Sequence, residues 1–96
     1  MSITSLYEEM MKNPRIAKLM AEEHLILEVT EKIVELMQRE NITKAELAKR
    51  LGRSKGFITR LLNGDRNFTV RTTADIFHVL DYGIQVMEIE KAIQIF

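Results

Sequence analysis

Apolar residues recur every three or four positions through residues 3–40, and this spacing predicts helices. A favourable helix start lies at Asn13 and Pro14, because asparagine is a good N-cap and proline fits the first helical turn. One apolar stripe then includes Leu19, Ile26, Val29, Ile33 and Leu36. No glycine or proline interrupts residues 15–51, so the pattern leaves two alternatives open: one long helix, or two helices that break between residues 24 and 30. A shorter amphipathic helix is predicted over residues 3–12.

Two short helices are predicted next, joined by a tight corner. Thr43 and Glu46 have the spacing of a capping box, in which each side chain satisfies a free backbone N–H of the other. The inward face of this helix is Leu47, Ala48 and Leu51. Gly52 stands where a helix end favours a left-handed residue, and Ser54 is placed to cap the following helix. Only a sharp turn fits between the two helices.

The second short helix has two contrasting faces. Ile58, Leu61 and Leu62 fall on one side at helical spacing, whereas Lys55, Gly56, Thr59, Arg60 and Asn63 fall on the other. Asn63 and Gly64 end this helix. A further helix is predicted from Thr69 to a stop at Gly83, with Ala74, Phe77, Val79 and Leu80 as its apolar residues.

This arrangement predicts a helix-turn-helix. The small Ala48 lets the two helices cross closely, Gly52 permits the corner, and the apolar pairs fix the angle between the helices. The polar face of the second helix is then held outward. In this motif the second helix enters the major groove of DNA, while the first crosses the phosphate backbone.

The distribution of charged residues along the chain supports the predicted helix-turn-helix. The chain has 96 residues, of which 46% are hydrophobic and 29% charged, as expected for one globular unit, and its formal net charge is zero. Residues 42–71 nevertheless contain eight lysines and arginines against two acidic residues. This segregation makes one end of the molecule attractive to a polyanion although the whole is neutral.

The C-terminal tail, residues 84–96, has a different pattern. Ile84, Val86, Glu88 and Glu90 alternate with Gln85, Met87 and Ile89, which predicts a short strand. Because an edge strand leaves backbone groups unpaired, a second subunit could satisfy them. The competing dimer interface is the amphipathic stretch of residues 14–28.

Other chemistries have little support in the sequence. The chain has no cysteine, which removes disulfides and cysteine-ligated zinc, and His24 and His78 stand apart without a ligand cluster. No nucleophile, phosphate loop or convincing carboxylate pair suggests catalysis. We therefore expect no enzyme activity, no metal and no cofactor. The lack of a signal peptide or a long apolar run predicts a cytoplasmic protein without a membrane partner.

Residues 42–86 resemble the Cro-repressor and lambda-repressor-like (XRE) helix-turn-helix domain. The residues that carry the resemblance are Leu47, Ala48, Leu51, Gly52, Ser54, Ile58, Leu61, Asn63 and Gly64. The resemblance implies an all-α, lambda-repressor-like helical bundle. On this basis residues 28–83 form the DNA-binding domain, residues 1–27 a helical extension, and residues 84–96 a strand-like tail that is a candidate dimerisation element.

The resemblance also implies which residues meet DNA. Those at base-facing positions are Lys55, Gly56, Thr59 and Arg60, and those at phosphate-contacting positions are Thr43, Lys44, Ser54 and Asn63. Arg53 and Arg66 are added to the phosphate contacts because of their charge. Since Gly56 has no side chain, direct readout is expected to rest on Lys55, Thr59 and Arg60.

The expected function is that of a sequence-specific transcriptional regulator, a dimeric repressor that binds a pseudo-palindromic operator in double-stranded DNA with residues 54–62 in the major groove. The flanking segments also resemble small antitoxins that repress their own operon. The alternative is therefore an antitoxin whose second partner is a protein toxin.

Overall fold

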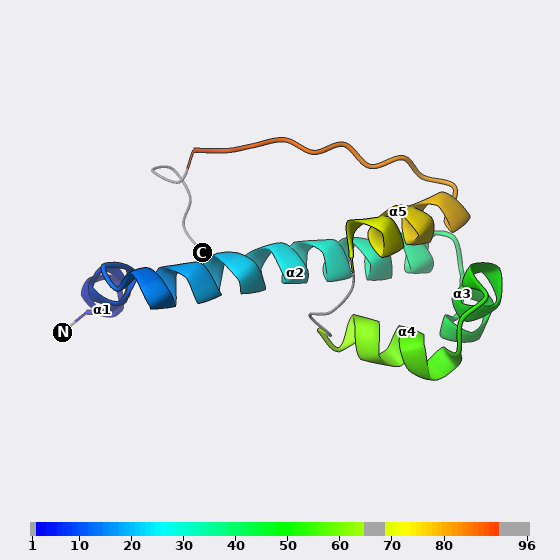
Figure 1. Ribbon diagram of the computed structural model, residues 1–96, viewed down its shortest axis with the longest axis horizontal. Coiled ribbons are helices and arrows are strands. Elements are labelled where there is room, and N and C mark those ends of the chain that lie inside the picture. Colours follow the sequence, from blue (N-terminus) through cyan, green and yellow to red (C-terminus); the bar gives the residue numbers. More distant parts are fainter. Residues whose placement is uncertain (1, 65–68, 91–96) are drawn as a thin grey trace.

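The structure, a computed structural model, describes residues 2–64 and 69–90. These residues form five helices and no strand: α1 (Ile3–Met11), α2 (Pro14–Arg39), α3 (Lys44–Leu51), α4 (Lys55–Leu62) and α5 (Val70–Val79). The all-α class expected from the sequence is confirmed. Figure 1 shows α2 as a long central helix, with α3, α4 and α5 gathered around its C-terminal half and α1 at its other end.

The long middle segment is one helix. α2 has 26 residues and continues through residues 24–30, where the sequence left a break open. In this region the hydroxyl of the buried Thr30 donates a hydrogen bond of 2.6 Å to the carbonyl of Ile26 in the preceding turn. The burial of this polar group is thus compensated within the helix itself.

The helices begin at the predicted N-caps. The side chains of Asn13, Thr43, Ser54 and Thr69 each accept a hydrogen bond of 3.0–3.2 Å from a backbone N–H in the first turn. These bonds satisfy donors that a helix start leaves free. The other half of the predicted capping box is replaced, because the Glu46 carboxylate accepts a hydrogen bond from Arg50 instead.

Three helices end in the same way, at a residue with positive φ. Asn41, Gly52 and Asp81 have φ values of 55°, 68° and 65°. After each of them the next residue donates its backbone N–H to a carbonyl five positions earlier, at 2.8–3.0 Å, as in a Schellman motif. The sequence predicted this for Gly52. The stop predicted at Gly83 was wrong, because α5 ends at Val79 and Asp81 takes the left-handed conformation.

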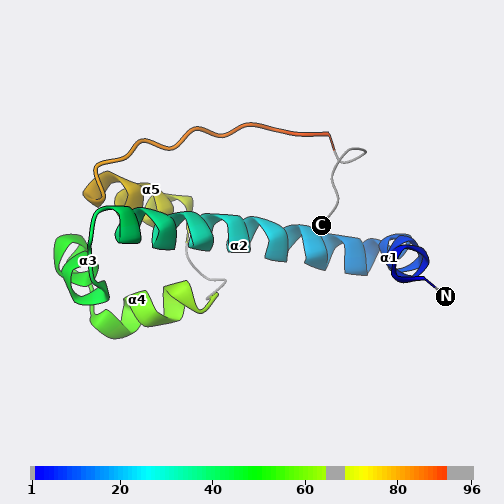
Figure 2. The same ribbon diagram turned by 180° about the vertical axis from the view of Figure 1, so that it is seen from behind.

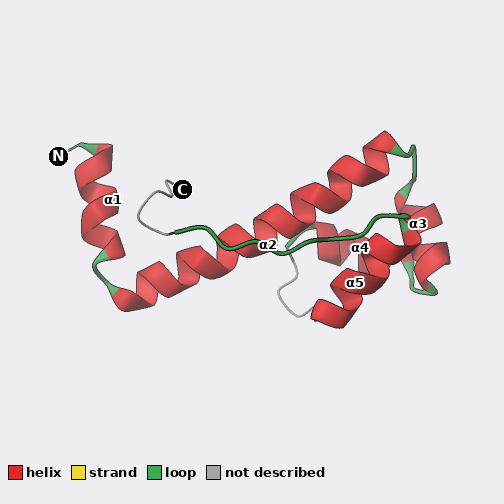
Figure 3. Cartoon of the chain, turned by 90° about the horizontal axis from the view of Figure 1, so that it is seen from above, coloured by secondary structure: helices red, strands yellow, loops and turns green. Residues whose placement is uncertain are grey.

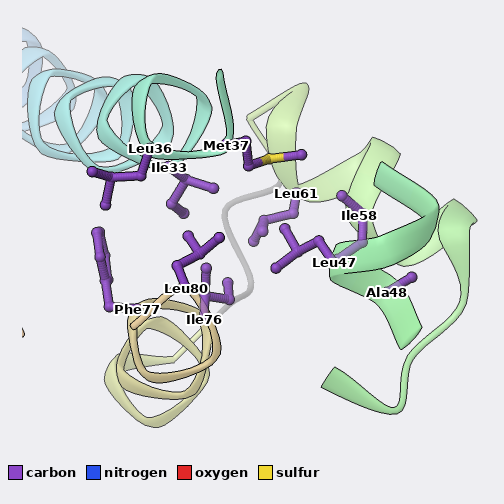
Figure 4. Packing of buried hydrophobic residues seen from close by; sticks show 10 residues of the cluster. All are labelled: Ile33, Leu36, Met37, Leu47, Ala48, Ile58, Leu61, Ile76, Phe77 and Leu80. Atoms are coloured by element: carbon purple, nitrogen blue, oxygen red, sulfur yellow. The ribbon is translucent and has the colours of Figure 1, made fainter. Parts of the chain in front are cut away.

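The core lies where the last turns of α2 meet the three short helices. Its buried residues are Ile33, Leu36, Met37, Leu47, Ala48, Ile58, Leu61, Ile76, Phe77 and Leu80. Figure 4 shows them converging from all four helices. Of the apolar faces predicted for α3 and α4, Leu47, Ala48, Ile58 and Leu61 are buried, whereas Leu51 and Leu62 are partly buried.

The N-terminal part of the molecule projects from this core. α1 packs on α2, and both extend away from α3, α4 and α5, as the two opposite views show (Figures 1 and 2). The molecule is correspondingly long, with extents of 48 × 25 × 22 Å. The buried residues of α2 begin only at Thr30, so its first half is outside the core.

The tail after α5 returns along α2, on the side opposite to α4 (Figures 1 and 3). Its start is fixed by the Tyr82 hydroxyl, which donates a 2.7 Å hydrogen bond to the Glu40 carboxylate. The same hydroxyl raises the pKa of the Arg39 guanidinium beside it. The predicted strand is not formed over residues 84–90, because an extended segment becomes a strand only with a neighbour to pair with. Residues 91–96 of that prediction lie outside the described residues.

Replacement of Leu47 by alanine tests the core. Leu47 is fully buried, so Leu47→Ala is expected to lower the free energy of unfolding by about 2–5 kcal/mol. The matched control is Leu27→Ala in α2, whose side chain is 56% exposed and whose loss should cost less than about 0.5 kcal/mol. Chemical denaturation followed by circular dichroism measures both values. Equal losses would contradict the assigned core.

A pair of glycine substitutions tests the corner. A Cβ at Gly52 meets nothing within 4 Å, so Gly52→Ala isolates the left-handed backbone, which costs about 1–2 kcal/mol for a residue with a side chain. Gly83→Ala is the control, because its Cβ also meets nothing and Gly83 has no positive φ. We expect a lower melting temperature for Gly52→Ala alone. A drop of the same size in Gly83→Ala would refute the account.

Candidate nucleic-acid interface

The corner between α3 and α4 is built from buried apolar contacts. Leu47 and Ala48 of α3 and Ile58 and Leu61 of α4 are at most 4% exposed and belong to one cluster. Figure 4 shows Leu47 beside Ile58 and Leu61, between the two helices. The backbone N–H of Arg53 donates to the Ala48 carbonyl at 2.9 Å and closes the turn. The orientation of α4 relative to α3 is fixed as a result.

The predicted base-facing residues lie on the outer side of α4. Lys55, Gly56 and Arg60 are exposed, whereas Thr59 is half-buried. All four therefore share one helix face, as the spacing predicted, but Thr59 offers less of its side chain than the other three. Its two cations, Lys55 and Arg60, are five residues apart, about 7.5 Å along the helix axis, a separation that a flexible arginine side chain can span.

Arg60 folds back toward the first turn of α4. A Cβ built on Gly56 would lie 3.5 Å from an Nη atom of Arg60 and 3.8 Å from the Ser54 hydroxyl oxygen. The missing side chain at position 56 therefore leaves space that the Arg60 guanidinium borders. The Arg60 guanidinium therefore lies near the N-terminal end of the helix, whose free N–H groups also favour an anion. Sequence reasoning did not find this role of Gly56.

Arg53 in the corner lies over an aromatic ring. Its guanidinium carbon is 4.7 Å from the centroid of Phe57, close enough for a cation–π interaction. Phe57 is half-buried and packs against the core, so its ring is a fixed platform. Arg53 thus presents its charge beside the start of α4.

The predicted phosphate contacts gather around the starts of α3 and α4. Thr43 and Ser54 are the N-caps of these helices, with their hydroxyl oxygens engaged by the backbone. Lys44 in the first turn of α3 and Asn63 at the end of α4 are exposed. Arg66 lies outside the described residues. The structure thus brings Thr43, Lys44, Arg53 and Ser54 to the two helix starts and leaves Asn63 at the far end of α4.

One cation of this region belongs to the scaffold. Arg50 donates to the Glu46 carboxylate at 3.1 Å and to the Val79 carbonyl at the end of α5 at 3.0 Å. It therefore ties α3 to α5. Lys44, Lys49, Lys55 and Arg60 form no ion pair with other residues of the described ranges. Their charges remain available to an external anion.

Residues 2–64 and 69–90 contain no group of three histidine, cysteine or acidic side chains arranged to hold a metal ion. None of the helices described there is long and apolar enough to cross a membrane.

Comparison with known proteins agrees with this geometry. A family model described as helix-turn-helix, HTH_3, matches residues 33–87, which is more than half of the chain. The match begins in α2, includes α3, α4 and α5, and ends in the tail. No curated protein and no solved structure gives a significant match. The chain therefore belongs to the XRE-type helix-turn-helix family of DNA-binding regulators.

Proposed function

We propose that the protein is a sequence-specific transcriptional repressor, which binds double-stranded DNA as a homodimer and places α4 in the major groove. The observation that carries this proposal is the outer face of α4. It presents Lys55 and Arg60, without ion pairs to other described residues, on a helix whose orientation the core fixes. We place this repressor in the cytoplasm.

Base recognition is assigned to Lys55, Thr59 and Arg60. Arginine and lysine are suited to the guanine O6 and N7 atoms at the major-groove edge, and a threonine methyl can contact a thymine methyl. Gly56 contributes by size, because a position without a side chain lets the helix approach the base edges closely. Since Thr59 is half-buried, we expect Arg60 and Lys55 to contribute most of the discrimination between base pairs.

Phosphate contacts are assigned to Thr43, Lys44, Arg53, Ser54 and Asn63, with Arg66 as a further contact. The described ones lie at the starts of α3 and α4 and at the end of α4, so they set the position of α4 in the groove. Contacts to phosphate do not depend on sequence, and they make affinity strongly dependent on salt. A repressor of this size gains specificity from two half-sites, which is the reason for proposing a homodimer on a pseudo-palindromic operator.

A second candidate function is that of an antitoxin that also binds a protein toxin. Its support is the apolar surface of the projecting extension, where Leu6, Leu19, Leu25 and Leu27 are 50–62% exposed. Exposed apolar groups that gather on one part of a protein often mark a protein partner. A neighbouring reading frame for a small nuclease-like protein, and copurification of its product with this chain, would favour the antitoxin; their absence would favour the repressor.

Two substitutions separate base reading from phosphate contact. With a duplex selected from random sequence by the purified protein, Arg60→Ala should cost about 1–3 kcal/mol of binding free energy and relax the preference at one base pair. Lys44→Ala should weaken selected and random duplexes alike and reduce the slope of log affinity against log salt by about one. Fluorescence anisotropy across a salt series measures all of these quantities.

The control is Lys18→Ala, which removes an exposed cation from the projecting half of α2. Its affinity for both duplexes should equal that of the unmodified protein. If Arg60→Ala and Lys44→Ala lose the same affinity on selected and random DNA, the assigned roles are wrong. If Lys18→Ala loses as much as either, the interface is not localised to α3 and α4.

A further inference from the structure

We propose that Gly56 is a specificity-determining residue, which sets the base pair that Arg60 reads. By having no side chain, Gly56 leaves the Arg60 guanidinium room to fold back over the first turn of α4. The inference rests on the proposed function and deepens it, because it adds a positioning role to a residue that offers DNA no side chain of its own. Gly56 thus acts through Arg60.

The first step is the position of the Arg60 side chain. Gly56 and Arg60 are four residues apart in α4, so they lie one above the other on the same face of the helix. A Cβ at position 56 would be 3.5 Å from an Nη atom of Arg60, which is van der Waals contact. The guanidinium has therefore returned by about four residues, or about 6 Å along the helix axis at 1.5 Å per residue.

The second step is that one neighbour of this space can move and the other is fixed. The Ser54 hydroxyl oxygen, 3.8 Å from the same Cβ position, accepts a 3.1 Å hydrogen bond from the Phe57 backbone and caps the helix. Arg60 is exposed and forms no ion pair with other residues of the described ranges. A side chain larger than alanine at position 56 would consequently displace the guanidinium rather than the cap.

The third step is the size of this displacement relative to DNA. Successive bases of one strand are about 3.4 Å apart along the duplex axis. A guanidinium displaced by up to about 6 Å therefore meets a base edge one or two steps away, or loses the bidentate contact with guanine O6 and N7. Loss of one such contact corresponds to roughly 5- to 150-fold in discrimination against the wrong base.

Close approach of α4 to the bases is a different role for Gly56, and the two roles predict different results. If Gly56 acts by close approach alone, any side chain at position 56 weakens binding to all duplexes alike and leaves the preferred bases unchanged. If Gly56 positions Arg60, the preference changes at the base pair that depends on Arg60, and a side chain that exceeds the space has the larger effect.

Selection of duplexes from a random pool distinguishes these roles, with the full chain and three variants: Arg60→Ala, Gly56→Ala and Gly56→Leu. Arg60→Ala identifies the base pair that depends on Arg60. At that base pair Gly56→Leu should reduce the preference by at least about fivefold, or move it by one or two base pairs. Gly56→Ala should change it far less, because its Cβ fits at 3.5 Å. The matched control is Gly83→Leu, where a Cβ meets nothing within 4 Å and every preference should be retained.

A second measurement needs no DNA. In the unmodified protein, nuclear Overhauser contacts should join the Gly56 Hα protons to the Arg60 Hδ protons, which come close only when the side chain folds back. Absence of these contacts would overturn the proposal. So would a Gly56→Leu variant that loses affinity on all duplexes alike. A protein that shows the contacts but selects no duplex would instead refute the proposed function, so the two failures are distinguishable.

Discussion

The fixed angle between α3 and α4 is the constraint on which the rest of the structure depends. It results from Leu47 and Ala48 on one helix and Ile58 and Leu61 on the other, all buried in one cluster. Gly52 makes the angle accessible to the backbone, because only a left-handed residue closes so short a corner. The polar side of α4 is consequently held away from the core. If this packing loosened, the cations of α4 would still be present, but they would no longer be presented in one geometry.

α2 combines two tasks in one helix. Its last turns supply Ile33, Leu36 and Met37 to the core that supports the corner, whereas its first turns extend beyond that core. A shorter helix would complete the same helix-turn-helix. The additional length carries α1, which packs on α2 within the same chain.

Much of the fold was predictable because local rules and burial agree. The caps at Thr43 and Ser54 and the corner at Gly52 follow from backbone hydrogen bonding, and the core faces follow from helical periodicity. The features that sequence reasoning missed depend on contacts between distant residues. In the sequence Arg50 cannot be distinguished from other surface cations, because its contact with the Val79 carbonyl depends on the position of α5. Similarly, Asp81 takes the left-handed conformation after α5, two residues before the glycine at which the sequence predicted the stop. The space that Gly56 leaves for Arg60 likewise depends on a side-chain conformation.

The central claim, that α4 reads base edges in the major groove, is tested most directly by methylation interference on a selected duplex. Dimethyl sulfate modifies guanine N7 in the major groove and adenine N3 in the minor groove, so the two grooves are probed in one experiment. The account predicts that methylated guanines in each half-site are strongly depleted from the bound fraction. It also predicts that this depletion disappears at one position when Arg60→Ala is used. Interference confined to adenine N3, or absent at every base, would contradict it.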